Sequence, residues 1–228
     1  MSTPPKLFLI PGMGADARLF EGLRREGLEF EVLEFIPPIV GESLREYALR
    51  MGEKIDTSKP YVLGGQSLGG TMATEIARVL KPEKLILISS LKNSREFPPY
   101  FKIGRFLPLH RIGSGKFWRE NGPRAGLKRI PEWQGKILKD MRNEASDDFV
   151  EWAVNAVVNW KSDYVHPNCL HIHGTRDFLL PGAFVRGRVA VRGGRHIMVL
   201  THAREVVAEI RRFLEKPSEN GSDQQTLR

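Results

Sequence analysis

Short apolar runs alternate with segments of helical periodicity along most of this chain of 228 residues. The apolar runs predict buried strands at 6–10, 30–36, 61–64, 85–89, 170–173 and 189–191. The spacing of apolar residues predicts helices at 17–26, 43–55, 68–80 and 202–214. Because strands and helices alternate, we expect an α/β fold, with a mostly parallel sheet covered by helices on both faces.

Residues 91–165 interrupt this alternation. They are rich in proline and end in a helix whose apolar face carries Phe149, Ala153, Ala156, Val157 and Trp160. Since strands are predicted on both sides, we expect an inserted helical cap here. The predicted domains are a first part of the core at 1–90, the cap at 91–165, a second part of the core at 166–216 and a disordered polar tail at 217–228.

The composition excludes several classes of protein. Hydrophobic residues make up 41% of the chain, which suffices for a core. No apolar run approaches the roughly 20 residues that cross a bilayer, and none has the length of a secretory signal. The single cysteine, Cys169, excludes an intramolecular disulfide and a thiolate zinc site. We therefore expect a soluble cytoplasmic protein with no membrane partner.

The net charge of +8 favours anionic partners. Five of these charges belong to residues 91–165, which hold 14 basic and 9 acidic side chains. No zinc-finger, bZIP or RNP motif accompanies them, so we expect solvated charge and no nucleic-acid partner.

The most informative motif is Gly65-Gln66-Ser67-Leu68-Gly69, between a predicted strand and a predicted helix. A tight turn at this junction holds its central residue in a strained conformation, and the small neighbours let other segments approach. Ser67 would then present its hydroxyl at the edge of the sheet, beside a helix N-terminus that favours developing negative charge. The pattern indicates a nucleophilic serine.

A serine hydroxyl needs a base to remove its proton and an acid to orient that base. Asp177 follows one downstream strand and His196 follows the next, in the order serine, acid, histidine that this type of turn requires. Both lie just beyond the carboxyl end of a strand, where Ser67 is expected. We predict Ser67 as nucleophile, His196 as base and Asp177 as acid.

Other candidates remain weaker. Asp163 is a rival acid, but it precedes a strand, and the rival bases are His110, His166 and His202. His171 and His173 share one face of a strand, which we interpret as packed, hydrogen-bonded histidines because no third metal ligand lies nearby. No metal or other cofactor is predicted.

An acyl-transfer intermediate needs two N–H donors for its oxyanion. The first is expected to be the backbone N–H of Leu68, directly after the nucleophile. The second should come from the loop Pro11-Gly12-Met13-Gly14 after the first strand, and the backbone N–H of Met13 is the candidate.

These segments, with Gly174-Thr175-Arg176-Asp177 and Gly194-Arg195-His196, resemble the α/β-hydrolase superfamily of serine hydrolases. The resemblance covers about 6–90 and 167–214, and residues 91–165 stand where the family carries its helical cap. It implies the α/β-hydrolase fold with about six strands, the same roles for Ser67, His196 and Asp177, and oxyanion donors at Met13 and Leu68.

Three features depart from the family pattern. Pro11-Gly12 replaces the common His-Gly entry to the oxyanion loop, and the family's leading antiparallel hairpin is expected to be missing. Arg195 stands directly before the histidine, where a small residue is frequent. None of these departures removes a predicted catalytic group.

Two other classes of protein fit parts of the chain. Gly12-x-Gly14-x-x-Ala17, with Glu34 further on, resembles a dinucleotide-binding Rossmann fingerprint. Gly64 to Thr71 approaches a phosphate loop but has Gly70 in place of the lysine. A non-catalytic binding protein on the same fold is the other alternative.

The predicted reaction is cleavage of a small-molecule carboxylic ester or thioester through an acyl-enzyme. The positive cap suggests an anionic leaving group, such as that of a coenzyme A or carrier-protein thioester. Aromatic residues predicted to line an acyl pocket or pack the cap are Phe101, Phe106, Phe117, Trp118, Trp133, Trp152 and Trp160. The sequence does not define the acyl chain, separate esterase from thioesterase, lactonase or C–C hydrolase, or give the oligomeric state.

Overall fold

Six strands form one sheet in the computed structural model, which describes residues 5–104, 116–117 and 130–217. The strand order is β2-β1-β3-β4-β5-β6, and each neighbouring pair is parallel. The strands are β1 Lys6–Ile10, β2 Glu31–Val32, β3 Tyr61–Gln66, β4 Lys84–Ile88, β5 Cys169–Gly174 and β6 Val189–Val191. The predicted α/β class and parallel sheet are therefore confirmed.

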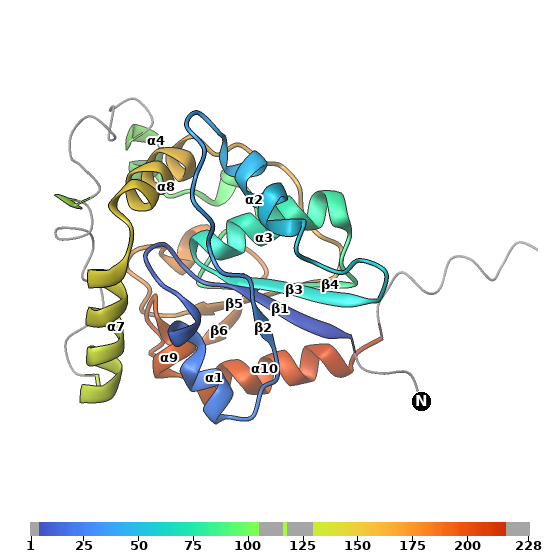
Figure 1. The fold of residues 1–228 in the computed structure, drawn as a ribbon. Helices are drawn as coiled ribbons and strands as arrows, with labels where there is room; N and C mark the ends of the chain where they lie inside the picture. The colour runs from blue at the N-terminus through green and yellow to red at the C-terminus, as the bar shows by residue number, and fades with distance from the viewer. Residues whose placement is uncertain (1–4, 105–115, 118–129, 218–228) are drawn as a thin grey trace, which may run out of the picture.

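Helices cover both faces of this sheet (Figure 1). One face carries α2 Leu44–Gly52, α3 Leu68–Leu80 and α8 Asp147–Asn159, and the other carries η1 Ala17–Phe20, α1 Glu21–Arg25, α9 Met198–Thr201 and α10 Ala203–Glu215. No described helix has the length and apolar character that crossing a membrane requires.

Alternate residues of the strands fill two separate cores. In β1, Phe8 and Ile10 pack with α2 and α3, whereas Leu7 and Leu9 pack with α1 and α10. This division follows from the period of two along a strand. Both faces of the central strands are covered, so these strands read as continuous apolar runs in the sequence.

Several predicted boundaries were wrong. The strand expected at 30–36 is only Glu31–Val32, with one more bond from Leu33 N–H to the Leu9 carbonyl at 3.0 Å. It is an edge strand that pairs with β1 alone, and Pro37 follows soon after.

The predicted helices also differ at their ends. The first is a 3-10 turn followed by the short α1, and the last, expected from 202, begins at Ala203 after the separate α9. The second ends at Gly52 instead of residue 55, and a capping box between Ser43 and Glu46 forms its N-terminus.

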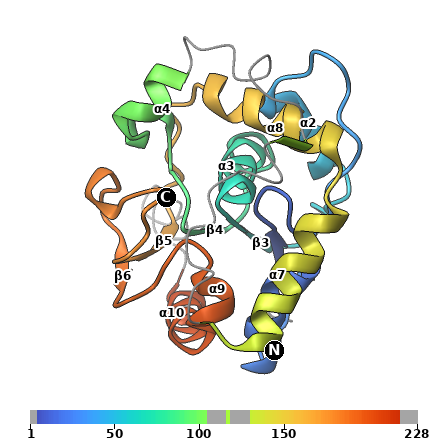
Figure 2. The same cartoon turned by 90° about the vertical axis from the view of Figure 1, so that its left-hand side faces the viewer.

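The insertion between β4 and β5 is helical where the structure describes it. It contains η2 Ser94–Glu96, α4 Pro99–Gly104, α7 Glu132–Glu144 and α8. Figure 2 looks onto the edge formed by the carboxyl ends of the strands, called here the carboxyl edge, and shows these helices around it. The predictions for Phe106, His110, Trp118 and the tail from 218 onward concern residues outside the described ranges.

Candidate active site

Ser67 lies at the turn between β3 and α3, with φ 53° and ψ −120°. A left-handed conformation of this kind costs a non-glycine residue about 1–3 kcal/mol, so the surrounding structure must hold it in place. Two glycines make this possible. A Cβ at Gly65 would stand 2.3 Å from the carbonyl carbon of Gly69, and one at Gly69 would stand 2.2 Å from the Ile10 oxygen. Any side chain at either position would force the turn open.

The hydroxyl of Ser67 is within hydrogen-bond distance of His196. The Oγ of Ser67 lies 2.9 Å from Nε2 of His196, and Nδ1 of the same ring lies 2.9 Å from Oδ2 of Asp177. With Nδ1–H donating to the carboxylate, Nε2 is left to accept the serine proton. The structure therefore brings together three side chains from three distant segments; Asp177 and His196 are buried, and Ser67 is half-buried.

Asp177 is held as a carboxylate. Its Oδ1 accepts hydrogen bonds from the backbone N–H groups of Leu179, at 3.0 Å, and Leu180, at 2.9 Å. Burial by itself raises the pKa of Asp177, but the hydrogen bonds and the nearby His196 outweigh burial and hold that pKa below its usual value. An ionised carboxylate fixes the imidazole tautomer and stabilises its protonated form.

A second histidine, His173, stands behind the carboxylate. Its Nε2 lies 2.6 Å from the Leu180 carbonyl and 3.4 Å from Oδ2 of Asp177. Since the carbonyl only accepts, Nε2 carries the proton and donates it to Leu180, while Oδ2 of Asp177 lies close to the same nitrogen. The sequence predicted a packed, hydrogen-bonded strand histidine here, but it gave no sign that the ring reaches Asp177.

His171 lies on β5, the strand of His173, and its ring lies behind the turn that carries Ser67. Its Nε2 donates to the Ser90 carbonyl at 2.9 Å, and the hydroxyl of Ser90 donates to the Ser67 carbonyl at 2.7 Å. Burial is the main cause that lowers the pKa of His171 to about 3, and burial also lowers the pKa of His173. Both rings are therefore neutral at ordinary pH.

Gln66 is a further residue of the site that the sequence analysis missed. Its side chain is 2% exposed and donates from Nε2 to the His196 carbonyl at 2.8 Å. Its Oε1 fills the space where a Cβ of residue 12 would stand, 2.1 Å from that position. A polar residue in an otherwise apolar buried strand was the available signal.

The loop after β1 lies against the serine turn. A Cβ at Gly12 would stand 3.4 Å from the Cβ of Ser67, and Ala15 N–H closes a turn onto the Gly12 carbonyl at 3.0 Å. Gly14, at φ 69°, provides the left-handed residue of that turn. Met13 is therefore carried beside the serine, while Leu68 is the first residue of α3 and its N–H has no partner within the helix.

The rival residues lie elsewhere or are occupied. Both ring nitrogens of His166 are hydrogen-bonded, to the backbone of Asn168 and to the Pro82 carbonyl, and Nδ1 of His202 bonds the Thr201 hydroxyl. Asp163 is exposed. In the described ranges no group of three or more His, Cys, Asp or Glu side chains could hold a metal ion.

The residues that would bind a dinucleotide already contact other parts of the protein. Glu34, the residue that would bind a ribose, accepts the Ala17 N–H at 3.2 Å. Gly12, whose bare backbone would approach a diphosphate, is covered by the Gln66 amide. Both groups serve the protein's own backbone, which argues against this alternative.

Comparison with solved structures shows the fold. A thermophilic esterase from Thermogutta terrifontis is 20% identical, with a TM-score of 0.66 over 94% of this chain and 90% of that one. An epoxide hydrolase of the α/β-hydrolase superfamily, from metagenomes of hot environments, is 15% identical, with a TM-score of 0.63 over 94% and 92%. The type II thioesterase YbtT of the yersiniabactin pathway is 17% identical, with a TM-score of 0.58 over 93% and 94%.

These likenesses confirm the predicted resemblance at the level of the fold: the chain has the fold of the α/β-hydrolase superfamily. No protein-family model and no curated protein sequence matches it. The three structures named above carry out different reactions on one fold, so the activity has to be argued from the site.

Proposed function

We propose that the protein is a serine hydrolase that cleaves a carboxylic ester or thioester through an acyl-enzyme. The observation that carries this proposal is the hydrogen-bonded row Ser67–His196–Asp177, with both contacts at 2.9 Å. Its serine is held in a strained turn at a helix N-terminus. A structural serine needs neither the base nor the strain.

In the first half of the reaction, Ser67 Oγ attacks the substrate carbonyl while His196 Nε2 takes its proton. Asp177 stabilises the imidazolium, and the N–H groups of Met13 and Leu68 stabilise the oxyanion. When the intermediate collapses, the bond to the leaving group breaks and His196 returns the proton to that group. Ser67 is left acylated.

In the second half, His196 removes a proton from water, which attacks the acyl-enzyme carbonyl. Collapse of this second intermediate releases the carboxylic acid and returns the proton to Ser67. Each cycle consumes one ester or thioester and one water molecule, and the steps need no cofactor.

Two observations support an ester or thioester as the substrate. The similar structures include an esterase and a thioesterase, which are ester-cleaving enzymes on this fold. Residues 91–165 are proposed to form the cap, and α8 brings apolar residues to the core that also contains Leu68 and packs against Met13. Of the aromatic residues singled out, Trp160 is buried against Phe97, and Trp133 packs under Arg25 on the outside.

Labelling with a fluorophosphonate probe and hydrolysis of a p-nitrophenyl ester test this proposal. Ser67→Ala should abolish labelling and lower kcat by at least about 10³-fold, because no other group provides the nucleophile. Ser58→Ala, at an exposed serine that bonds Asp56, is the matched control and should keep both. Undiminished hydrolysis by the Ser67→Ala enzyme, with its fold intact by circular dichroism, would remove Ser67 from the mechanism.

A further inference from the structure

The twenty residues from Arg176 to Arg195 contain five arginines and a single carboxylate, Asp177. The next acidic residue along the chain is Glu205. We call these five arginines the arginine rim: Arg176, Arg186, Arg188, Arg192 and Arg195. We propose that the arginine rim binds phosphate on the leaving group of the substrate, an inference that rests on the proposed hydrolase function.

The arginine rim belongs to the loops that carry the acid and the base. Arg176 directly precedes Asp177, and Arg195 directly precedes His196. The two loops touch, since Arg176 N–H donates to the Gly194 carbonyl at 2.8 Å. A Cβ at Gly174 would stand 2.2 Å from the oxygen of Gly194, which shows how closely they pack. Arg176 and Arg195 therefore flank the acid and the base along the chain, and Arg192 follows β6 in the loop that leads to His196.

Several arginines elsewhere on the surface pair with carboxylates. Arg18 pairs with Asp16 and Glu144, both at 2.6 Å. Arg25, Arg50 and Arg212 pair with Glu21, Glu42 and Glu209 at 3.0, 2.7 and 2.6 Å.

No member of the arginine rim makes an ion pair within the described part of the chain. Arg195 is half-buried and the other four are exposed. Five guanidinium groups without counter-charges form a field that attracts an anion from solution.

The location of the arginine rim decides which part of the substrate is anionic. His196 has to hand its proton to the leaving atom, so the leaving group departs on the side of His196. The carbonyl oxygen lies at the oxyanion donors Met13 and Leu68, whose side chains pack with α8 in one apolar core. We therefore place the anionic charge on the leaving group, on the side of His196.

Phosphate is the anion that suits several arginines at once. Its oxygens accept paired N–H donors from a planar guanidinium, and each phosphate carries more charge than a carboxylate. A thiol or alcohol that bears one or more phosphates is the leaving group this chemistry describes. Such a group occurs both on a free coenzyme and on the prosthetic arm of a carrier protein.

A graded series of thioesters with one acyl group tests the inference. The members are acyl-pantetheine, acyl-4′-phosphopantetheine and acyl-coenzyme A, which share the thiol and differ in phosphate content. We expect kcat/KM to rise at least about tenfold from the first to the second at low salt, and this gain to shrink at 0.5 M NaCl, where the Debye length is only a few ångströms.

Two triple variants distinguish an effect of the arginine rim from an effect of the net charge of the whole protein. Arg186→Gln/Arg188→Gln/Arg192→Gln should lower the ratio of kcat/KM for acyl-phosphopantetheine over acyl-pantetheine at least about fivefold. Arg24→Gln/Arg25→Gln/Arg212→Gln removes the same charge from outside the rim, so it is the matched control and should keep the ratio. An equal loss of the ratio in both triple variants would overturn the inference, because the field would then be that of the whole molecule.

The two proposals fail differently. Equal kcat/KM for the three thioesters, with hydrolysis still dependent on Ser67, overturns the phosphate inference and leaves the hydrolase intact. Absence of both hydrolysis and fluorophosphonate labelling overturns the hydrolase itself. A gain complete at acyl-phosphopantetheine identifies the part shared with carrier proteins, whereas a further gain with acyl-coenzyme A identifies the free coenzyme as the source.

Discussion

At the scale of single residues, the acid of the candidate site is controlled by its neighbours. Asp177 receives two backbone N–H bonds on one oxygen, and on the other it faces the rings of His196 and His173. His173 also donates to the Leu180 carbonyl, which ends the turn whose N–H groups hold the carboxylate. It is thus a positioning residue for the acid.

Replacing His173 separates this role from simple packing. His173→Leu removes the Nε2–H donor, so we expect kcat to fall about tenfold with KM nearly unchanged. The pKa of Asp177 should rise, and the acidic limb of the kcat/KM profile should move to higher pH. His173→Gln can place an amide N–H near the position of Nε2 and should restore part of kcat and the original limb. Equal behaviour of the two variants would reduce His173 to a packing residue.

At the scale of elements, β5 carries two buried neutral histidines, and this couples stability to pH. The pKa of His171 is lowered to about 3 and that of His173 is also lowered, in both cases chiefly by burial. In the unfolded chain both return to about 6.5. As the pH falls below about 6.5, the unfolded state takes up protons that the folded state does not, so the free energy of unfolding decreases.

The change His171→Gln tests this coupling. It removes one of the two groups and can keep a donor toward the Ser90 carbonyl. The slope of unfolding free energy against pH between about 6 and 4.5 should decrease by up to about 1.4 kcal/mol per unit. Urea unfolding from about pH 4.5 to 8 measures it. The curves should be parallel above about pH 7, and parallel curves at low pH as well would contradict the prediction.

Elements with strong local patterns were predictable from the sequence. The strand, tight turn and helix around Ser67 follow from an apolar run, glycines at 65 and 69, and a helical repeat. The edge strand β2 and the ends of the first and last helices were mispredicted, because edge pairing and short 3-10 turns depend on neighbours. A residue pattern does not encode them.

The candidate site was also predictable from the sequence only in part. The order of Ser67, Asp177 and His196, each after a strand, was sufficient to predict that they meet. The contacts of Gln66 with the His196 carbonyl and of His173 with Asp177 were not predictable, because they depend on side-chain directions in the folded chain.

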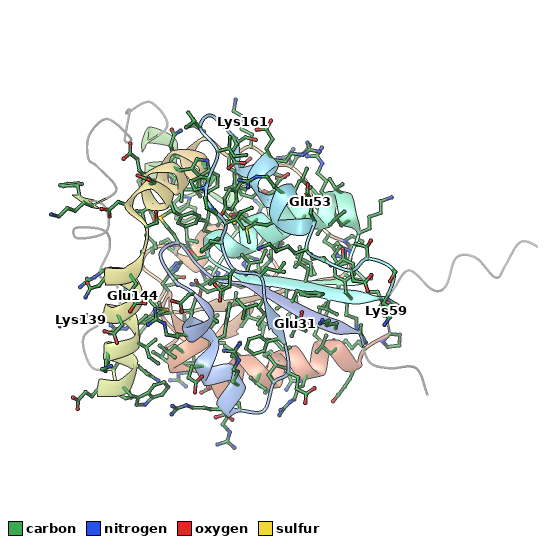
Figure 3. All side chains as sticks on the ribbon, viewed as in Figure 1. Glu31, Glu53, Lys59, Lys139, Glu144 and Lys161 are labelled. Carbon is green, nitrogen blue, oxygen red and sulfur yellow. The ribbon has the colours of Figure 1, made fainter. Side chains whose placement is uncertain are left out.

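At the scale of the whole molecule, α7 packs against the core on the face of α1 and α10. Met141 is 3% exposed and belongs to the same apolar cluster as Leu7 and Leu9. Glu144, near the end of α7 and labelled in Figure 3, forms an ion pair with Arg18 on the surface beside it. Two kinds of contact thus hold the helix in place.

The packing of Met141 and the ion pair of Glu144 should contribute differently to the free energy of unfolding. Met141→Ala leaves a cavity in a closed core, so the free energy of unfolding should fall by about 2–4 kcal/mol. Glu144→Gln weakens a solvent-exposed pair and should cost less than about 1 kcal/mol. Chemical denaturation of the two variants beside the parent chain compares them. A larger loss for Glu144→Gln would mean that charge, instead of apolar packing, holds α7.

The Gln66 amide has a consequence for directed evolution of this protein. It fills the space above Gly12 and binds the main chain of His196, so one side chain interlocks three segments that a mutagenesis library would treat as independent. Most random substitutions at position 12 or 66 would break these contacts and inactivate the variant, whatever substrate is screened. Diversity is better introduced at exposed positions of α8, because the contacts of Gln66 with residue 12 and with His196 do not involve this helix.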